Sequence, residues 1–76
     1  MRDKILAILE DVNPIILTYE GNTLLEDGTI DSFEVIDIVS AIEDEFEIEI
    51  DAALVVSDNF ANKETIIKMV EEIIEG

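Results

Sequence analysis

The segment from Ser32 to about Phe46 constrains the fold of this chain more than any other part of the sequence. Apolar side chains recur in it at the spacing of a helix that lays one face against a core. Asp31 and Glu34 just before and within its first turn have the spacing of a capping box, in which each side chain accepts a hydrogen bond from the backbone amide of the other residue. We therefore expect a helix from Ser32 to about Phe46, with a core-facing stripe of Val35, Ile38, Val39, Ile42 and Phe46.

Two further helices are expected at the ends of the chain. The first runs from about Asp3 to Val12 and stops at Asn13-Pro14, because a residue before proline is pushed out of the helical region. The last runs from Lys63 to Ile74 behind an Asn62 cap. A one-turn helix containing Phe60, capped by Ser57 or Asp58, is a further expectation.

The connections between these helices are of two kinds. Residues 15–30 are expected to form a long connection with its own apolar side chains and turn residues, which usually means that it packs on itself or carries function. Residues 47–51 alternate like a strand, but no partner strand is visible, so we expect an extended connector that buries Ile48 and Ile50. The predicted fold is all-α: one domain, residues 1–76, with three main helices, one short helix and a long loop between the first and second main helices.

The charge of the chain narrows its partners. The formal net charge is −16, yet 49% of the residues are hydrophobic, which is too apolar for a disordered acidic tail. Residues 5–62 contain no Lys or Arg. Such a surface repels nucleic acid and anionic lipid and attracts proteins with basic patches. The alternative is that the acidic residues serve only solubility.

Several kinds of chemistry are excluded or disfavoured. The chain has no Cys and no His, so it lacks disulfides, thiolate ligands and the commonest general base. The acidic run 43–51 lacks the glycine and ligand spacing of an EF-hand, and we expect no specific metal site. No apolar stretch is long enough for a membrane span and no signal peptide is visible, so we expect a cytoplasmic protein. No arrangement of a nucleophile and a base stands out in the sequence, so we expect a monomer that is not an enzyme.

Ser32 is the one serine in a chemically suggestive position. It begins the central helix after a glycine-containing loop, so its hydroxyl should reach solvent, and a phosphate attached to it would face the positive end of the helix. Taken alone, Ser32 is better explained as an ordinary capping or first-turn residue. A hydrolase that uses Ser32 is a poor alternative, since no base is available to activate it.

The wider sequence resembles the acyl carrier protein family. The resemblance rests on Asp31-Ser32-Phe33 at the start of an acidic helix, on the Phe46 to Ile50 continuation and on a pattern that extends over residues 23–74. It implies that a phosphopantetheinyl transferase attaches 4'-phosphopantetheine to Ser32, beside Asp31, and that the arm carries acyl or aminoacyl groups as thioesters, as in fatty acid biosynthesis. It also implies that partner enzymes with basic surfaces dock on a second set of residues, namely Phe33, Glu34, Ile36, Asp37, Glu43 and Asp44.

Three departures from the family pattern and one subfamily hint complete the comparison. Many family members have Gly where this chain has Glu47, so the end of the central helix is expected to differ. Many have Pro where this chain has Asp51, and a larger apolar residue where it has Ser40. Residues 25–28 and 59–62 look closer to stand-alone carriers resembling D-alanyl carrier proteins. A different class of function stays open: an acidic helical interaction module without a prosthetic group.

Overall fold

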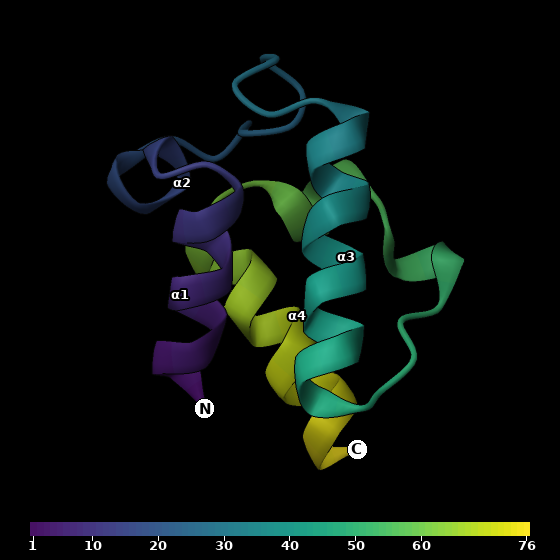
Figure 1. The fold of residues 1–76 in the computed structure, drawn as a ribbon. Coiled ribbons are helices and arrows are strands. Elements are labelled where there is room, and N and C mark those ends of the chain that lie inside the picture. Colours follow the sequence, from purple (N-terminus) through teal and green to yellow (C-terminus); the bar gives the residue numbers. More distant parts are fainter.

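A computed structural model describes residues 1–76 and consists of helices joined by loops, with no strand (Figure 1). This confirms the predicted all-α fold class. None of the helices combines the length and the apolar character that a membrane span requires. The long helices are α1 (Arg2–Val12), α3 (Ser32–Phe46) and α4 (Lys63–Glu75), and the shorter elements are α2 (Ile15–Thr18) and the 3₁₀ turns η1 (Ala52–Leu54) and η2 (Ser57–Phe60).

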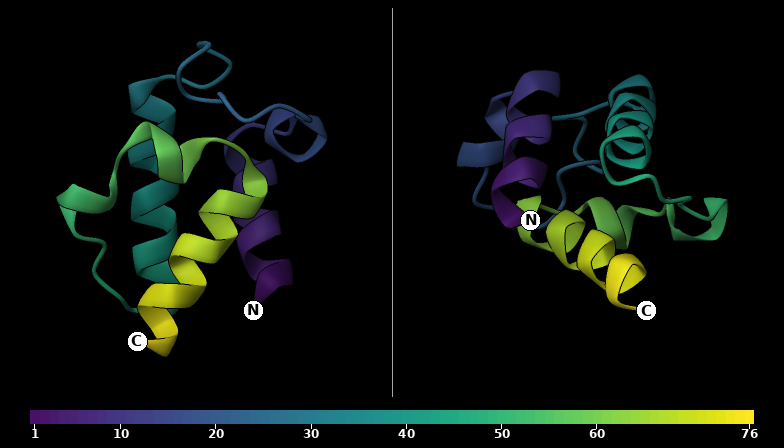
Figure 2. Two further views of the ribbon diagram at one scale, coloured as in Figure 1. Left: turned by 180° about the vertical axis from the view of Figure 1, so that it is seen from behind. Right: turned by 60° about the horizontal axis from the view of Figure 1, so that its bottom comes forward.

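The helices pack as a small bundle that holds α3 along one side. α1 lies beside α3 and runs in the opposite direction, while α4 crosses the pair obliquely and brings both chain termini to the same end (Figures 1 and 2). η2 lies against α4, and α2 against α1. The start of α3 therefore lies at the end of the molecule away from both termini, next to the loop that follows α2.

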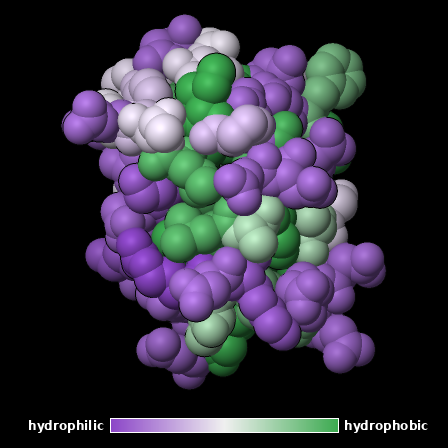
Figure 3. All heavy atoms as spheres, turned by 60° about the vertical axis from the view of Figure 1, so that its left-hand side comes forward, coloured by the Kyte–Doolittle hydropathy of each residue, from purple (hydrophilic) through white to green (hydrophobic).

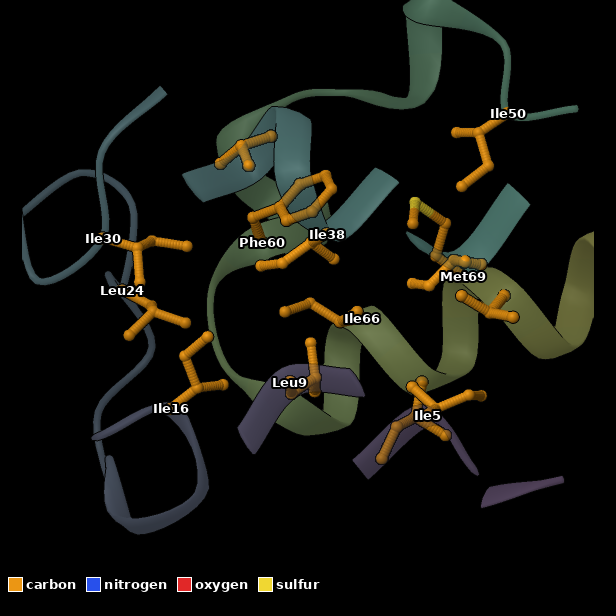
Figure 4. Packing of buried hydrophobic residues seen from close by; sticks show 14 residues of the cluster. Ile5, Leu9, Ile16, Leu24, Ile30, Ile38, Ile50, Phe60, Ile66 and Met69 are labelled. Carbon is orange, nitrogen blue, oxygen red and sulfur yellow. The ribbon is translucent and has the colours of Figure 1, made fainter. Parts of the chain in front are cut away.

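The core is entirely apolar and draws on every helix except η1. Phe60 is fully buried among isoleucines of α3 and α4, and Ile16, Leu24 and Ile30 extend the core beneath the long loop (Figure 4). No polar or charged residue is buried. All the acidic side chains consequently lie in contact with solvent, which lets the fold tolerate its net charge of −16.

The helix boundaries expected from capping motifs are confirmed. α3 begins with a complete capping box: Glu34 N donates to Asp31 Oδ1 over 2.8 Å, and Asp31 N donates to Glu34 Oε1 over 3.3 Å. α4 begins with the equivalent arrangement, in which Thr65 N donates to Asn62 Oδ1 and Asn62 N donates to Thr65 Oγ1. Side-chain caps thus determine where α3 and α4 start.

The expectations for the connecting segments need two corrections. Residues 15–30 do not form one continuous connection, because they begin with α2. Pro14 supplies a helical φ of −61° and Asn13 Oδ1 accepts a hydrogen bond from Ile15 N, which together start this short helix. Ser57 and Asp58 do not cap the turn containing Phe60, since both lie inside η2, which is preceded by Val56 in extended conformation.

The segment after α3 is extended, as expected. Residues 48–50 form no strand, Ile50 is buried and Ile48 is half-buried. The end of α3 does not differ from the left-handed cap usual for glycine: Glu47 itself adopts that conformation, with φ 53° and ψ 46°. A side chain in this region costs about 1–2 kcal/mol relative to a right-handed conformation, so Glu47 is a strained position.

We expect Glu47→Gly to stabilise the fold. Glycine adopts a positive φ without a steric penalty, and the substitution also removes a negative charge from the negative end of the α3 dipole. The melting temperature should rise by about 4 °C, measured by circular dichroism. The matched control is Glu49→Gly, which removes the same side chain two residues later, where φ is not positive. Equal effects of the two substitutions would contradict the strain at Glu47.

A second stability prediction concerns the surface charge, which has few internal partners. The structure contains two ion pairs, Arg2 with Glu64 and Lys4 with Glu45, and all four side chains are substantially exposed. On the face in Figure 3, hydrophilic residues surround a central band of hydrophobic ones. Raising ionic strength from about 0.01 to about 1 M shortens the screening length from about 30 to about 3 Å, so carboxylate repulsion should weaken. We expect salt or magnesium to raise the melting temperature by several degrees in thermal unfolding; a flat response would mean that internal pairing already relieves the repulsion.

Candidate functional site

Ser32 is the first residue of α3, and its side chain is exposed. The four amides at the start of a helix lack partners within the helix. Here the amide of Glu34 donates to Asp31 Oδ1 and that of Val35 to the Asp31 carbonyl, whereas the amides of Ser32 and Phe33 donate to no protein group. The helix therefore offers a reachable hydroxyl next to two free N–H donors.

This arrangement fits a phosphodiester on Ser32. Free amides at the positive end of a helix dipole favour an anion. The carboxylate of the preceding residue, Asp31, accepts from the amide of Glu34 in the capping box. An oxygen of a phosphate on Ser32 would find donors in the amides of Ser32 and Phe33. The chemistry of the donor set is thus compatible with the group that the sequence resemblance implies.

Glu34 holds the start of α3 in place. One carboxylate oxygen accepts from the amide of Asp31 and the other accepts from Asn13 Nδ2 over 3.0 Å. Asn13 is the residue at which α1 ends. Glu34 therefore joins the end of α1 to the first turn of α3, in addition to the docking role predicted for it from the sequence.

The loop before Ser32 is ordered by a hydrogen-bond network centred on Asp27. Its Oδ1 accepts from Thr29 N (2.9 Å) and Thr29 Oγ1 (2.6 Å), and its Oδ2 accepts from Tyr19 Oη (2.6 Å). The Thr23 hydroxyl lies 3.0 Å from Tyr19 Oη and 3.3 Å from Asp27 Oδ2. The bond from the Thr29 hydroxyl, followed by those from Tyr19 and from the Thr29 amide, lowers the pKa of Asp27 from 3.8 to about 2. The carboxylate thus stays ionised, and the network complete, at neutral and mildly acidic pH.

The same loop is tied to the body of the protein at several points. Leu24 and Ile30 are buried, Leu24 N donates to the Ala61 carbonyl over 3.0 Å, and Ile30 N donates to the Leu24 carbonyl over 3.3 Å. Gly28, with φ 83°, provides the turn between them. Lys63 Nζ donates to the carbonyl of Leu17 at the end of α2. The loop that precedes Ser32 consequently has a well-defined conformation, although it contains no regular secondary structure.

The exposed face of α3 combines apolar and acidic side chains. Phe33 is 76% exposed and Ile36 is 58% exposed, which is unusual for large apolar residues on a helix that also faces a core. Asp37 and Asp44 are exposed on the same helix. An exposed apolar pair flanked by carboxylates is suited to contact with a protein surface that has an apolar centre and basic rim.

Glu43 differs from the other residues predicted for docking. It is half-buried, and its Oε2 accepts from the amide of Ile50 over 2.8 Å. The carbonyl of Glu43 also accepts from the amides of Glu47 and Ile48. Glu43 therefore holds the connector against the end of α3, and the structure does not gather it with Phe33 at the opposite end of the helix.

Sequence reasoning missed the Asp27 network, Asn13 and the exposed Val56. The run Asp27-Gly28-Thr29 carried a usable signal, because Asp commonly accepts from the amide two residues later in a turn. Val56 is 45% exposed in the loop between η1 and η2, and nothing in its sequence position indicated this. No group of three or more His, Cys, Asp or Glu side chains is placed to hold a metal ion.

The fold and the site together describe a small acidic helical bundle with an exposed serine at the start of its central helix. No family model matches the chain. A D-alanyl carrier protein from Bacillus mycoides is 32% identical over 74 residues, which cover 95% of this chain and 94% of that protein. The chain belongs to the acyl carrier protein family. The relative is a carrier protein and not an enzyme, which bears out the expectation that this chain is a carrier as well.

Proposed function

We propose that Ser32 carries a covalent 4'-phosphopantetheine arm, on which the protein transports acyl or aminoacyl groups as thioesters between enzymes. The observation that supports this most directly is the exposed Ser32 hydroxyl beside two free amides, in a chain that belongs to a carrier family. Family membership implies the prosthetic group. Asp31 contributes by capping α3, which keeps the helix start folded around the modified serine.

The attachment reaction forms one phosphoester bond and breaks one pyrophosphate bond. The Ser32 oxygen bonds to the phosphorus of the pantetheine arm of coenzyme A, the nucleotide part of coenzyme A leaves, and the hydroxyl proton passes to solvent or the transferase. The arm supplies the thiol that this cysteine-free chain lacks. The side chains of this protein then hold the arm's base and bind partners.

The second candidate concerns the cargo. The relative from Bacillus mycoides is named a D-alanyl carrier protein, and its match extends over nearly the whole of both chains. This favours D-alanyl or another aminoacyl group, as used in cell-wall or secondary-metabolite pathways, over a fatty acyl group. Either cargo is compatible with attachment to Ser32.

The partners follow from the charge and the exposed face of α3. We propose that the protein acts as a cytoplasmic monomer of one domain, residues 1–76, and binds a phosphopantetheinyl transferase and acyl- or aminoacyl-transfer enzymes. Phe33 and Ile36 would supply apolar contact, and Asp37 and Asp44 would face basic side chains. Nucleic acid is not expected to bind a chain with a net charge of −16.

The test is an intact-mass measurement after incubation with a phosphopantetheinyl transferase and coenzyme A. We expect a gain of one phosphopantetheine mass. The modified protein is then offered to activating enzymes for amino acids and fatty acids, and the charged product identifies the cargo. If several active transferases leave the mass unchanged, the carrier proposal fails and the acidic interaction module becomes the better interpretation.

A further inference from the structure

Asp27 connects three parts of the loop that leads to Ser32. Its carboxylate accepts from Tyr19 just after α2, approaches Thr23 in the middle of the loop, and accepts twice from Thr29 near its end. The network joins side chains that lie at the surface or are partly exposed, and of these only Tyr19 also packs against the apolar core. Its effect is to hold the two halves of the loop together.

The end of this network lies close in sequence to the modified residue. Thr29 is followed by Ile30, which is 1% exposed, then by the helix cap Asp31, then by Ser32. The two hydrogen bonds from Thr29 to Asp27 therefore hold the backbone at the residue just before the buried Ile30. No side chain of the network is part of the first turn of α3, and none supplies a donor to the Ser32 hydroxyl.

We propose that Asp27 is a positioning residue for the modification of Ser32: it keeps the loop of residues 19–31 in the conformation that the transferase binds. This inference rests on the proposed attachment of phosphopantetheine to Ser32. With Asp27 present, the loop is ordered before the transferase arrives. Without it, only a fraction of the molecules holds the binding-competent loop, and the apparent affinity falls by that fraction.

The expected signature is a change in KM rather than in kcat. Loss of the Asp27 side chain does not alter the reacting atoms, which are the Ser32 oxygen and the phosphorus of the pantetheine arm of coenzyme A, once the complex has formed. We expect Asp27→Ala to raise KM for the carrier about tenfold with kcat within about twofold of the original, since the loss acts on the competent population. A merely structural role would lower the melting temperature and leave KM unchanged at temperatures where the protein is folded.

Glu26→Ala is the matched control. It removes the same charge at the neighbouring exposed position, which takes no part in the network. Asp27→Asn is the conservative variant, because its amide oxygen can still accept from Thr29. Neutral hydrogen bonds are weaker than charge-assisted ones, so KM for Asp27→Asn should rise only about threefold. Hydrogen exchange at the Thr29 amide, followed by NMR, should accelerate in Asp27→Ala and stay slow in Glu26→Ala.

The possible outcomes distinguish a failure of the positioning role of Asp27 from a failure of the proposed attachment to Ser32. If the unaltered protein gains no mass, the attachment proposal fails. If the unaltered protein is modified and folded Asp27→Ala has the same KM as Glu26→Ala, the positioning role is overturned. Should Asp27→Ala not fold, Tyr19→Phe removes a single hydroxyl from the same network; a raised KM there supports the role, and an unchanged KM overturns it.

Discussion

Ser32→Ala is expected to abolish the gain of mass on incubation with transferase and coenzyme A. The substitution removes the only oxygen through which this position can bond to phosphorus. The fold should be retained, because Ser32 is exposed and the cap of α3 is made by Asp31 and Glu34. Intact mass spectrometry gives the result directly, since no product rather than a slower reaction is expected.

Ser40→Ala is the control for this substitution. Ser40 lies on the same helix and is also exposed, but it is in the middle of α3, where the backbone amides are already bonded within the helix. The Ser40→Ala variant should gain the phosphopantetheine mass at the same rate as the unaltered protein. Full modification of Ser32→Ala, or loss of modification in Ser40→Ala, would place the attachment point elsewhere.

Phe60→Ala is expected to give the largest loss of stability in this chain. Phe60 is fully buried and lies among Ile38, Ile66 and other apolar side chains of α3 and α4 (Figure 4). Truncating a buried Phe costs about 3–5 kcal/mol, whereas small domains have only about 0.05–0.15 kcal/mol of stability per residue. The melting temperature should fall by about 12 °C or more, with partial unfolding at room temperature.

Phe33→Ala deletes the same aromatic ring from a position that is 76% exposed. Such surface changes usually alter stability by no more than about 0.5 kcal/mol. Thermal unfolding of the two variants side by side should therefore separate a core phenylalanine from a surface one. Similar melting temperatures would show that Phe60 is not part of a tightly packed core.

The long helices could be predicted because their signals are local. The capping boxes of α3 and α4 each lie within one turn, and the apolar period of α3 extends over the whole helix, so its bounds Ser32–Phe46 agree with the expectation. Ser32 was selected by its place in this local pattern together with the family resemblance. Helix α2 escaped prediction because four residues are too few to show a period.

The parts of the site that could not be predicted depend on pairs of residues far apart in the chain. Asn13 and Glu34 are separated by 21 positions, and their contact exists only because the end of α1 packs near the start of α3. The Glu43 carboxylate reaches the Ile50 amide because Glu47 turns the chain back with a positive φ. No periodicity encodes either event. The sequence therefore predicted only the capping-box role of Glu34 and not its bond to Asn13, and it gave Glu43 no partner within the fold.

The Asn13–Glu34 hydrogen bond has a consequence for transport. A tethered group reaches its target at an effective concentration that depends on the length and stiffness of the tether. Motion of the residue to which the tether is attached adds to the volume that the group explores. Because this bond joins the start of α3 to a second helix, the base of an arm on Ser32 would move with the whole bundle and not independently of it. The volume that the cargo explores would then depend only on the length and flexibility of the arm. A partner bound to α3 would always meet the attachment point of the arm in the same position.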